Sequence, residues 1–326
     1  MVASNITQLL ATYINALHIL HYHRVLDGYG HLSVRNPKNP PTFFMMHQMA
    51  PALVSGLDDI GEYRVSDAEP VHPGTPSAPI ERFIHSEILK RYPDVNVVLH
   101  GHPEELVSYS ISNVPLRAAI HMAPFLSECR LFVGNLGAHA NIYIGREVPN
   151  FDITKYYLPN DMQDFLVRNQ HLGAALSAEF DDPSSYASGN GTQVTYNGDG
   201  ADHSSEDDHD DNKRYGSRDG GYSSYPRHNL VLMRSHGFTA VATDIKVITF
   251  EGIYAVTNAK IESKALLIQH AFKGNAAQGA NGIAYLTQRQ IQNSWETEIQ
   301  TVEKPWALWV REVHVDPLYV NELDQD

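Results

Sequence analysis

Apolar side chains are distributed along the chain in two patterns, one typical of helices and the other typical of strands. Residues 7–25 carry apolar side chains at helical spacing, and the same spacing recurs between Ser77 and Pro93 and over residues 248–271. Short apolar runs predict strands at residues 31–35, 42–46, 63–65, 95–100 and 229–234, and the fourth of these is typical of a strand buried on both faces. Helices and strands in alternation predict a layered α/β domain with helices on both faces of its sheet.

Residues 181–228 interrupt this alternation. They are rich in Ser, Gly, Asn, Asp and Tyr and include the acidic run 202–211. A segment of this composition buries too little apolar surface to offset the entropy of ordering it. It is therefore predicted to be a disordered acidic insert, with residues 1–180 and 229–326 as the two parts of a single domain.

Composition narrows the classes of partner and compartment. The 326 residues include 24 Lys and Arg against 38 Asp and Glu, a net charge of −14 that argues against binding to nucleic acid. No apolar run reaches the roughly 18 residues of a membrane span, so no membrane partner is expected. The single cysteine, Cys129, fits a reducing compartment, and the expected location is cytoplasmic. Cys129 is interpreted as a small buried residue rather than a catalytic thiol.

Two histidines mark the end of the strand predicted to be buried on both faces. His100 and His102 project from the same side of an extended chain, and Gly101 between them allows a close backbone approach. His236 lies at the end of a second apolar strand, the one predicted at residues 229–234, and precedes Gly237. If the two strands are neighbours, three imidazoles converge and leave open coordination positions, as in catalytic metal sites. The alternative is that these are ordinary surface or core histidines.

Glu81 is expected in the first turn of the helix that leads to this strand, with His85 one turn further on the same face. A carboxylate there can exchange a proton with a substrate held on a metal. The alternatives are a solvated helix-cap acid for Glu81 and, for His85, a role that is limited to orienting Glu81 or to packing. The sequence contains no dinucleotide fingerprint, phosphate loop or nucleophile elbow that would favour another chemistry.

Three ordered segments resemble the signatures of the class II aldolase/adducin family. Residues 30–35 (Gly-His-Leu-Ser-Val-Arg) resemble the first signature, and Glu81 together with residues 91–102 resembles the second. Residues 234–237 (Arg-Ser-His-Gly), followed by a helix that contains Glu251, resemble the third. The resemblance covers residues 8–180 and 229–274, which is most of the chain.

The resemblance implies a three-layer α/β/α sandwich around a central mixed, mainly antiparallel β-sheet. It implies a divalent metal held by His100, His102 and His236, with Glu81 as the catalytic acid and base. Zinc suits three imidazoles best, while iron, manganese and magnesium stay open. It also implies a homotetramer with active sites between subunits, and a reaction that cleaves or isomerises a carbon skeleton through a metal-bound enediolate or enolate.

The first signature departs from that of the sugar-phosphate aldolases. The sugar-phosphate aldolases have Asn at the position of His31. They also have a Thr/Ser-Gly turn, which helps hold phosphate, at the position of residues 47–51 of this chain. The chain is more similar to a Gly-His-x-Ser-x-Arg subgroup, which includes decarboxylases of hydroxylated aromatic or dienoic carboxylates. His31, Ser33 and Arg35, with His85, are therefore expected to bind the substrate, and the alternative for Arg35 is to cap a local turn.

The leading hypothesis is a metal-dependent carbon–carbon lyase, either a decarboxylase or a retro-aldolase. Its expected small-molecule substrate is a hydroxy or oxo carboxylic acid without phosphate, aromatic acids included. A non-haem iron oxygenase on the same fold and a non-catalytic interaction module like adducin are the alternatives. Tyr285 and Tyr319 are both candidates for the C-terminal tyrosine that donates a proton in the family, and no motif separates them.

Overall fold

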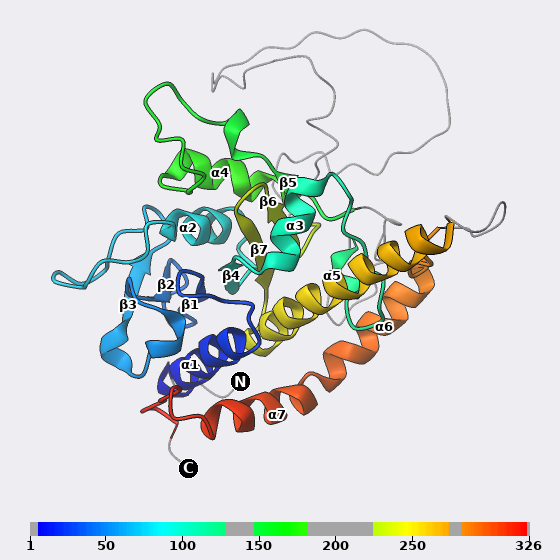
Figure 1. Cartoon of the computed structure of the whole chain (residues 1–326). Helices are drawn as coiled ribbons and strands as arrows, with labels where there is room; N and C mark the ends of the chain where they lie inside the picture. The colour runs from blue at the N-terminus through cyan, green and yellow to red at the C-terminus, as the bar shows by residue number, and fades with distance from the viewer. Residues whose placement is uncertain (1–5, 128–146, 182–223, 274–281, 325–326) are drawn as a thin grey trace, which may run out of the picture.

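A mixed β-sheet organises the chain (Figure 1). The computed structural model describes residues 6–127, 147–181, 224–273 and 282–324. Among these residues, seven strands lie in the order β3-β2-β1-β4-β7-β6-β5, and all neighbours are antiparallel except the parallel pair β5 and β6. The strands are β1 (His31–Arg35), β2 (Thr42–Met46), β3 (Ile60–Arg64), β4 (Val97–Gly101), β5 (Asn150–Phe151), β6 (Leu230–Met233) and β7 (Gly237–Ala242).

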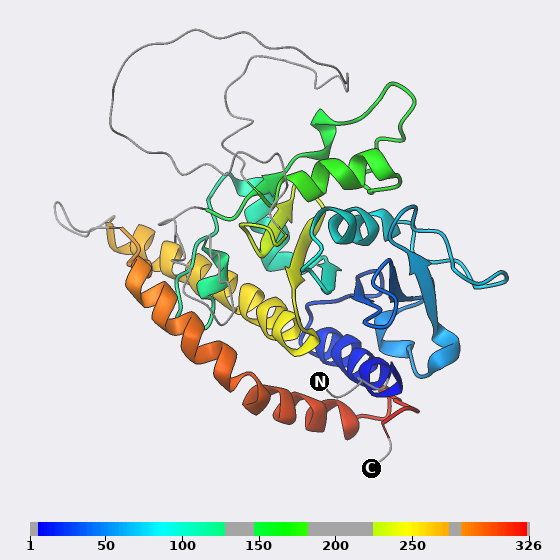
Figure 2. The same cartoon turned by 180° about the vertical axis from the view of Figure 1, so that it is seen from behind.

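Helices cover both faces of this sheet, with further helices outside them. The α-helices are α1 (Ile6–Tyr22), α2 (Arg82–Arg91), α3 (Glu104–Ser112), α4 (Gln170–Ala178), α5 (Ile245–Lys273), α6 (Gln288–Thr301) and α7 (Glu303–His314). Helix α7 contacts α1 and α5, and α6 continues along the outer side of α5 (Figure 2). None of the helices in the described part of the chain is both long and apolar enough to cross a membrane.

The two apolar layers follow from the alternation of side chains along each strand. Val97 and Leu99 of β4 join the core cluster that contains α1, α3 and α5, whereas Val98 joins the cluster that contains α2 and α4. Every residue of β4 is buried, as predicted for this strand. The predicted three-layer α/β/α sandwich with a mainly antiparallel mixed sheet is therefore confirmed, and α6 and α7 add to its α1 and α5 side.

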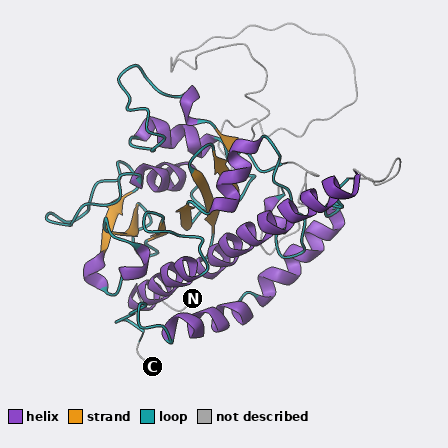
Figure 3. Cartoon of the chain, viewed as in Figure 1, coloured by secondary structure: helices purple, strands orange, loops and turns teal. Residues whose placement is uncertain are grey.

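The condition considered for the convergence of the three histidines, that the strands leading to His100 and His236 are neighbours, is not met. Figure 3 draws the strands of this sheet in orange among the surrounding helices. The strand that leads to His236, β6, is not a neighbour of β4, because β7 lies between them in the sheet. The reason is a tight turn in which Ser235 has a φ of 59° and the N–H of His236 donates to the carbonyl oxygen of Met233 at 3.0 Å. The chain therefore reverses at once and places β7 against β4.

The two ends of the predicted insert lie side by side. The carbonyl oxygen of Phe180 accepts the backbone N–H groups of Arg227 and His228 at 3.1 and 3.0 Å, and Tyr225 packs against the core. Residues 224–228 therefore contact the folded domain, although their composition places them in the insert. Residues 182–223, and also Cys129, lie outside the described residues.

Candidate metal centre and active-site pocket

Two glycines allow other segments to pack against the end of β4. A Cβ at Gly101 would lie 2.6 Å from the carbonyl oxygen of Val25, and a Cβ at Gly237 would lie 2.2 Å from the carbonyl oxygen of Gly101. Both distances are too short for any side chain, so glycine is required at each position. The close approach at Gly237 brings His236 to the end of the strand that carries His100.

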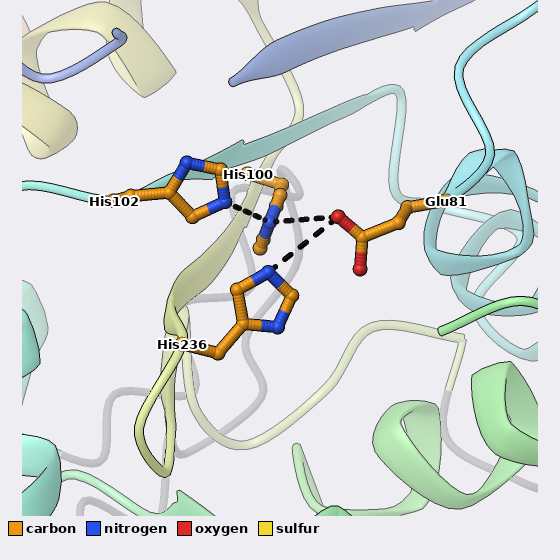
Figure 4. A group of neighbouring side chains, drawn as sticks. All are labelled: Glu81, His100, His102 and His236. Atoms are coloured by element: carbon orange, nitrogen blue, oxygen red, sulfur yellow. Dashed lines mark hydrogen bonds and ion pairs between the residues drawn. The ribbon is translucent and has the colours of Figure 1, made fainter. Parts of the chain in front are cut away.

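Glu81, His100, His102 and His236 form one cluster, in which the carboxylate faces the three imidazoles (Figure 4). Their potential ligand atoms all lie within 4.8 Å of one another. Nε2 of His100 is 2.9 Å from Nε2 of His102, and Oε2 of Glu81 is 3.5 Å from Nε2 of both His100 and His236. The structure thus brings together the four residues that the sequence nominated for metal binding and proton transfer.

The outer nitrogens of two imidazoles fix their tautomers. Nδ1 of His100 lies 2.9 Å from the carbonyl oxygen of Phe238, and Nδ1 of His102 lies 3.2 Å from both carboxylate oxygens of Asp27. Because these oxygens only accept hydrogen bonds, each Nδ1 carries the proton of its neutral ring. The two Nε2 lone pairs then face each other across 2.9 Å, which is repulsive without a cation or proton between them. A divalent metal fits this set of imidazole and carboxylate donors.

Burial and mutual contact set the protonation states within the cluster. Burial lowers the pKa of His100 to about 4. Burial alone would raise the pKa of Glu81, but its interactions with His100 and His236 hold that pKa well below its usual range. Glu81 is therefore ionised and His100 neutral at pH 7, which are the forms that bind metal ions.

Glu81 is oriented by a segment far away in the sequence. It directly precedes α2, which begins at Arg82, and so does not lie in the first turn of that helix. Its Oε1 accepts the backbone N–H of Val167 at 3.0 Å. This hydrogen bond leaves Oε2 directed at the imidazoles of the cluster.

A chain of buried polar side chains reaches the cluster region through His31. The Ser33 hydroxyl lies 2.7 Å from Nδ1 of His85, and Nε2 of His85 lies 2.7 Å from Nδ1 of His31. Burial lowers the pKa of His85 to about 3 and that of His31 well below its usual value, so both rings are neutral. When the serine hydroxyl donates to His85, each nitrogen in the chain is satisfied and Nε2 of His31 retains a proton to donate.

Three residues predicted to bind the substrate, Ser33, His85 and Arg35, belong neither to the cluster nor to the described lining of the adjacent cavity. Ser33 and His85 are connected to the site through His31, whereas Arg35 lies apart from it. The guanidinium of Arg35 donates to the backbone carbonyl oxygens of Val95, Pro40, Leu89 and Tyr92 at 2.7–3.3 Å. These bonds connect the end of β1 to the end of α2 and to the segment before β4. The placement matches the alternative role of a local cap and does not match a substrate contact.

A cavity of about 760 Å³ opens beside the cluster. Its polar lining includes Glu81, His102 and His236, together with His31. Tyr29, which is 83 % exposed, lies at its rim. The apolar part of the lining consists of Met46, Met49, Ala50, Pro79, Ile80, Phe165 and Leu166. A mostly apolar cavity with a few convergent polar groups is typical of a small-molecule site.

The chain is similar in sequence to known proteins of one family. Residues 10–160 match the class II aldolase and adducin N-terminal domain. The chain is 38% identical over 311 residues to the decarboxylase tropJ of Talaromyces stipitatus, covering 95% of this chain and 96% of the relative. This chain belongs to the class II aldolase and adducin family. The predicted family is confirmed, and so is the prediction of an enzyme of the lyase class.

Solved structures show the same fold as this class II aldolase family member. L-fuculose 1-phosphate aldolase from Glaciozyma antarctica PI12 has a TM-score of 0.56 and 13% identity, covering 97% of this chain and 92% of that chain. An aldolase II superfamily protein from Pseudomonas syringae has a TM-score of 0.59 and 14% identity, covering 99% and 98%. At such low identity, the likeness shows the fold alone.

Two parts of the site in this class II aldolase family member could not be predicted from its sequence. Asp27 is recognisable only as the first residue of an Asp-Gly-Tyr-Gly turn, although an Asp at that place is a ready acceptor of hydrogen bonds. The loop that carries Phe165, Leu166 and Val167 offers no signal. Nothing in the sequence distinguishes apolar side chains that line a cavity from those that pack in the core, and Val167 contacts Glu81 through its backbone N–H.

Both tyrosines considered as the family's C-terminal proton donor are engaged elsewhere in the described chain. The hydroxyl of Tyr319 lies 2.9 Å from Nδ1 of His21 on α1. The hydroxyl of Tyr285 donates to Oε1 of Glu262 at 2.7 Å. Among the described residues, neither tyrosine lines the cavity of its own chain.

Proposed function

We propose that this chain is a metal-dependent carbon–carbon lyase acting on a small hydroxy or oxo carboxylic acid without phosphate, with hydroxylated aromatic acids favoured. The observation that carries the proposal is the convergence of Glu81 and three imidazoles beside a mostly apolar cavity. The similarity to a decarboxylase supports loss of carbon dioxide as the reaction. Retro-aldol cleavage would use the same residues.

His100, His102 and His236 would hold the divalent metal, for which zinc is the proposed identity because it suits imidazole ligands. When bound, the ion supplies positive charge that draws electrons from the bond being cleaved and stabilises the negative charge left on the substrate. The Phe238 carbonyl and the Asp27 carboxylate keep the lone pairs of two of these rings directed at the cluster.

Glu81 would carry the proton. With Oε1 held by the Val167 amide, Oε2 is free to take the proton of a substrate hydroxyl. For a hydroxylated aromatic acid, Oε2 then delivers this proton to the ring carbon that bears the carboxylate. The bond to the carboxyl carbon breaks, carbon dioxide leaves, and the electron pair of that bond returns to the ring and its oxygen. The proton added to the carbon is the one taken from the hydroxyl, so no other donor is needed.

The cavity favours an aromatic acid over a sugar phosphate. Its described lining contains neither Lys nor Arg, the side chains that most often bind phosphate. Met49, Phe165 and Leu166 supply apolar surface on which a ring can pack. His31, held by His85 and Ser33, would donate from Nε2 to a substrate oxygen.

The reaction is tested by incubating the metal-loaded full chain with a panel of hydroxylated aromatic and oxo acids. Release of carbon dioxide, or of an aldehyde or ketone fragment, is the expected result, and His100→Ala should abolish it. Full metal occupancy without turnover on the whole panel would contradict the proposal. Consumption of dioxygen coupled to turnover would favour the iron oxygenase instead.

We also propose a cytoplasmic homotetramer with active sites between subunits. Three apolar side chains near the end of α5, Leu267, Ile268 and Phe272, are 60–71% exposed and offer apolar surface for such a contact. Light scattering of the purified protein should give four times the chain mass. A monomer at micromolar concentration would contradict the proposed assembly.

A further inference from the structure

The carboxylate of Asp27 contacts both the cluster and the cavity rim. It lies in the connection between α1 and β1, where Oδ1 accepts the backbone N–H groups of Tyr29 at 2.9 Å and Gly30 at 2.8 Å. Both of its oxygens also lie 3.2 Å from Nδ1 of His102. One side chain thus joins a turn of the cavity rim to an imidazole of the cluster.

We infer that Asp27 is a positioning residue that fixes His102 for metal binding and ties it to the Tyr29 turn. The inference rests on the metal centre of the proposed function. A carboxylate beside Nδ1 keeps the proton on that atom, directs the lone pair of Nε2 into the cluster and makes the ring a better ligand. Without it, the ring can rotate, and the other tautomer, which presents N–H to the cluster, becomes accessible.

The surroundings of Asp27 show that its position does not depend on His102, so Asp27 orients the imidazole and not the reverse. A Cβ at Gly30 would lie 3.1 Å from the carbonyl oxygen of His100 and 3.3 Å from Cα of Gly101, so the turn is packed directly on β4. Its two N–H groups anchor the carboxylate independently of the imidazole. The position of Asp27 is therefore set by the backbone, and His102 is oriented against it.

The test uses Asp27→Asn and Asp27→Ala in the full chain, stripped of metal and titrated with Co²⁺ against a competing chelator. Removing such a partner of a ligand histidine typically weakens metal binding about 10- to 100-fold. The Asp27 side chain is 48% exposed, so we expect a loss near tenfold for Asn and a larger loss for Ala. The Co²⁺ absorption spectrum should also change, because one ligand is reoriented.

The matched control is Asp67→Asn, which alters another partly exposed turn carboxylate. Asp67 accepts the backbone N–H of Glu69 at 3.0 Å and pairs with Arg64, and it belongs to no part of the cluster. Its Co²⁺ affinity should stay within twofold of the wild type. In a His102→Ala background, Asp27→Asn should cause no further loss, because Asp27 acts through His102.

The outcomes separate the inference from the function on which it rests. If both Asp27 variants lower the melting temperature of the metal-free protein but keep the wild-type Co²⁺ affinity and spectrum, Asp27 is only a turn cap and the inference is wrong. The metal centre would then still stand. A wild-type chain that binds no Co²⁺ would overturn the proposed function and the inference together.

Discussion

Glu251 provides a test of the electrostatics of the core, away from the metal cluster. It is fully buried on α5, where Nδ2 of Asn229 donates to its Oε1 at 2.7 Å. Its Oε2 has no hydrogen-bond partner among the described residues. Burial raises the pKa of Glu251 from its ordinary value of 4.5 to about 8. The folded protein therefore retains this proton at pH values where the unfolded chain has released it.

The sign and size of the effect follow from proton linkage. Below pH 4.5 both states are protonated, and Glu251 leaves the free energy of unfolding unaffected. Between pH 4.5 and about 8 the unfolded state binds fewer protons, so the free energy of unfolding falls by about 1.4 kcal/mol per pH unit. At pH 7 the loss from this one group is on the order of 3 kcal/mol.

Glu251→Gln should remove this loss, because the amide is neutral at every pH and can still accept from Asn229. Urea unfolding of the metal-free protein at pH 5, 6, 7 and 8 should show the variant gaining on the wild type as the pH rises, by about 3 kcal/mol from pH 5 to pH 7. Glu303→Gln, at an exposed carboxylate on α7, should show no such trend. A constant difference between Glu251→Gln and the wild type across this range would refute the reasoning.

Three further substitutions test the site and its support. His236→Ala should lose bound metal, measured by elemental analysis, with an unchanged circular dichroism spectrum; full metal retention would exclude it as a ligand. Arg35→Met should lower stability in urea by about 1–3 kcal/mol, because it leaves carbonyl groups unpaired, and should leave the KM of an identified substrate unchanged. A higher KM at unchanged stability would restore a substrate role. Gly237→Ala should lose metal and cost at least 1–3 kcal/mol in the same urea assay, since its Cβ would overlap the Gly101 carbonyl; wild-type metal content would contradict this account.

The parts of the fold that were predictable are those with a local pattern. The bounds of β1 and β2 agree with the sequence prediction because turn residues flank both apolar runs. His100, His102 and His236 could be nominated because each adjoins a glycine at the end of an apolar run. The sequence does not predict strand β7, because it begins directly after His236 and the turn of residues 234–236 that separates it from β6 is too short to be recognised from composition.

The remaining parts depend on contacts between distant segments. The bond from the Val167 amide to Glu81 involves a backbone group, which every residue except proline offers. The contact of Asp27 with His102 exists only because the α1–β1 connection packs on β4. Arg35 has the charge expected of a carboxylate-binding residue, but four backbone carbonyls occupy its donors once α2 and β4 have folded beside it. Residue type and spacing therefore identify the side chains that can bind a metal, but not the groups that orient those side chains.

The pairing of the Phe180 carbonyl with the amides of Arg227 and His228 has a practical consequence for engineering. Because the chain leaves and re-enters the domain at a single point, a reporter protein or affinity handle whose own termini are close could replace the intervening residues without stretching α4 or β6. Such a fusion would place the reporter outside the layered core and leave the end of β4 untouched.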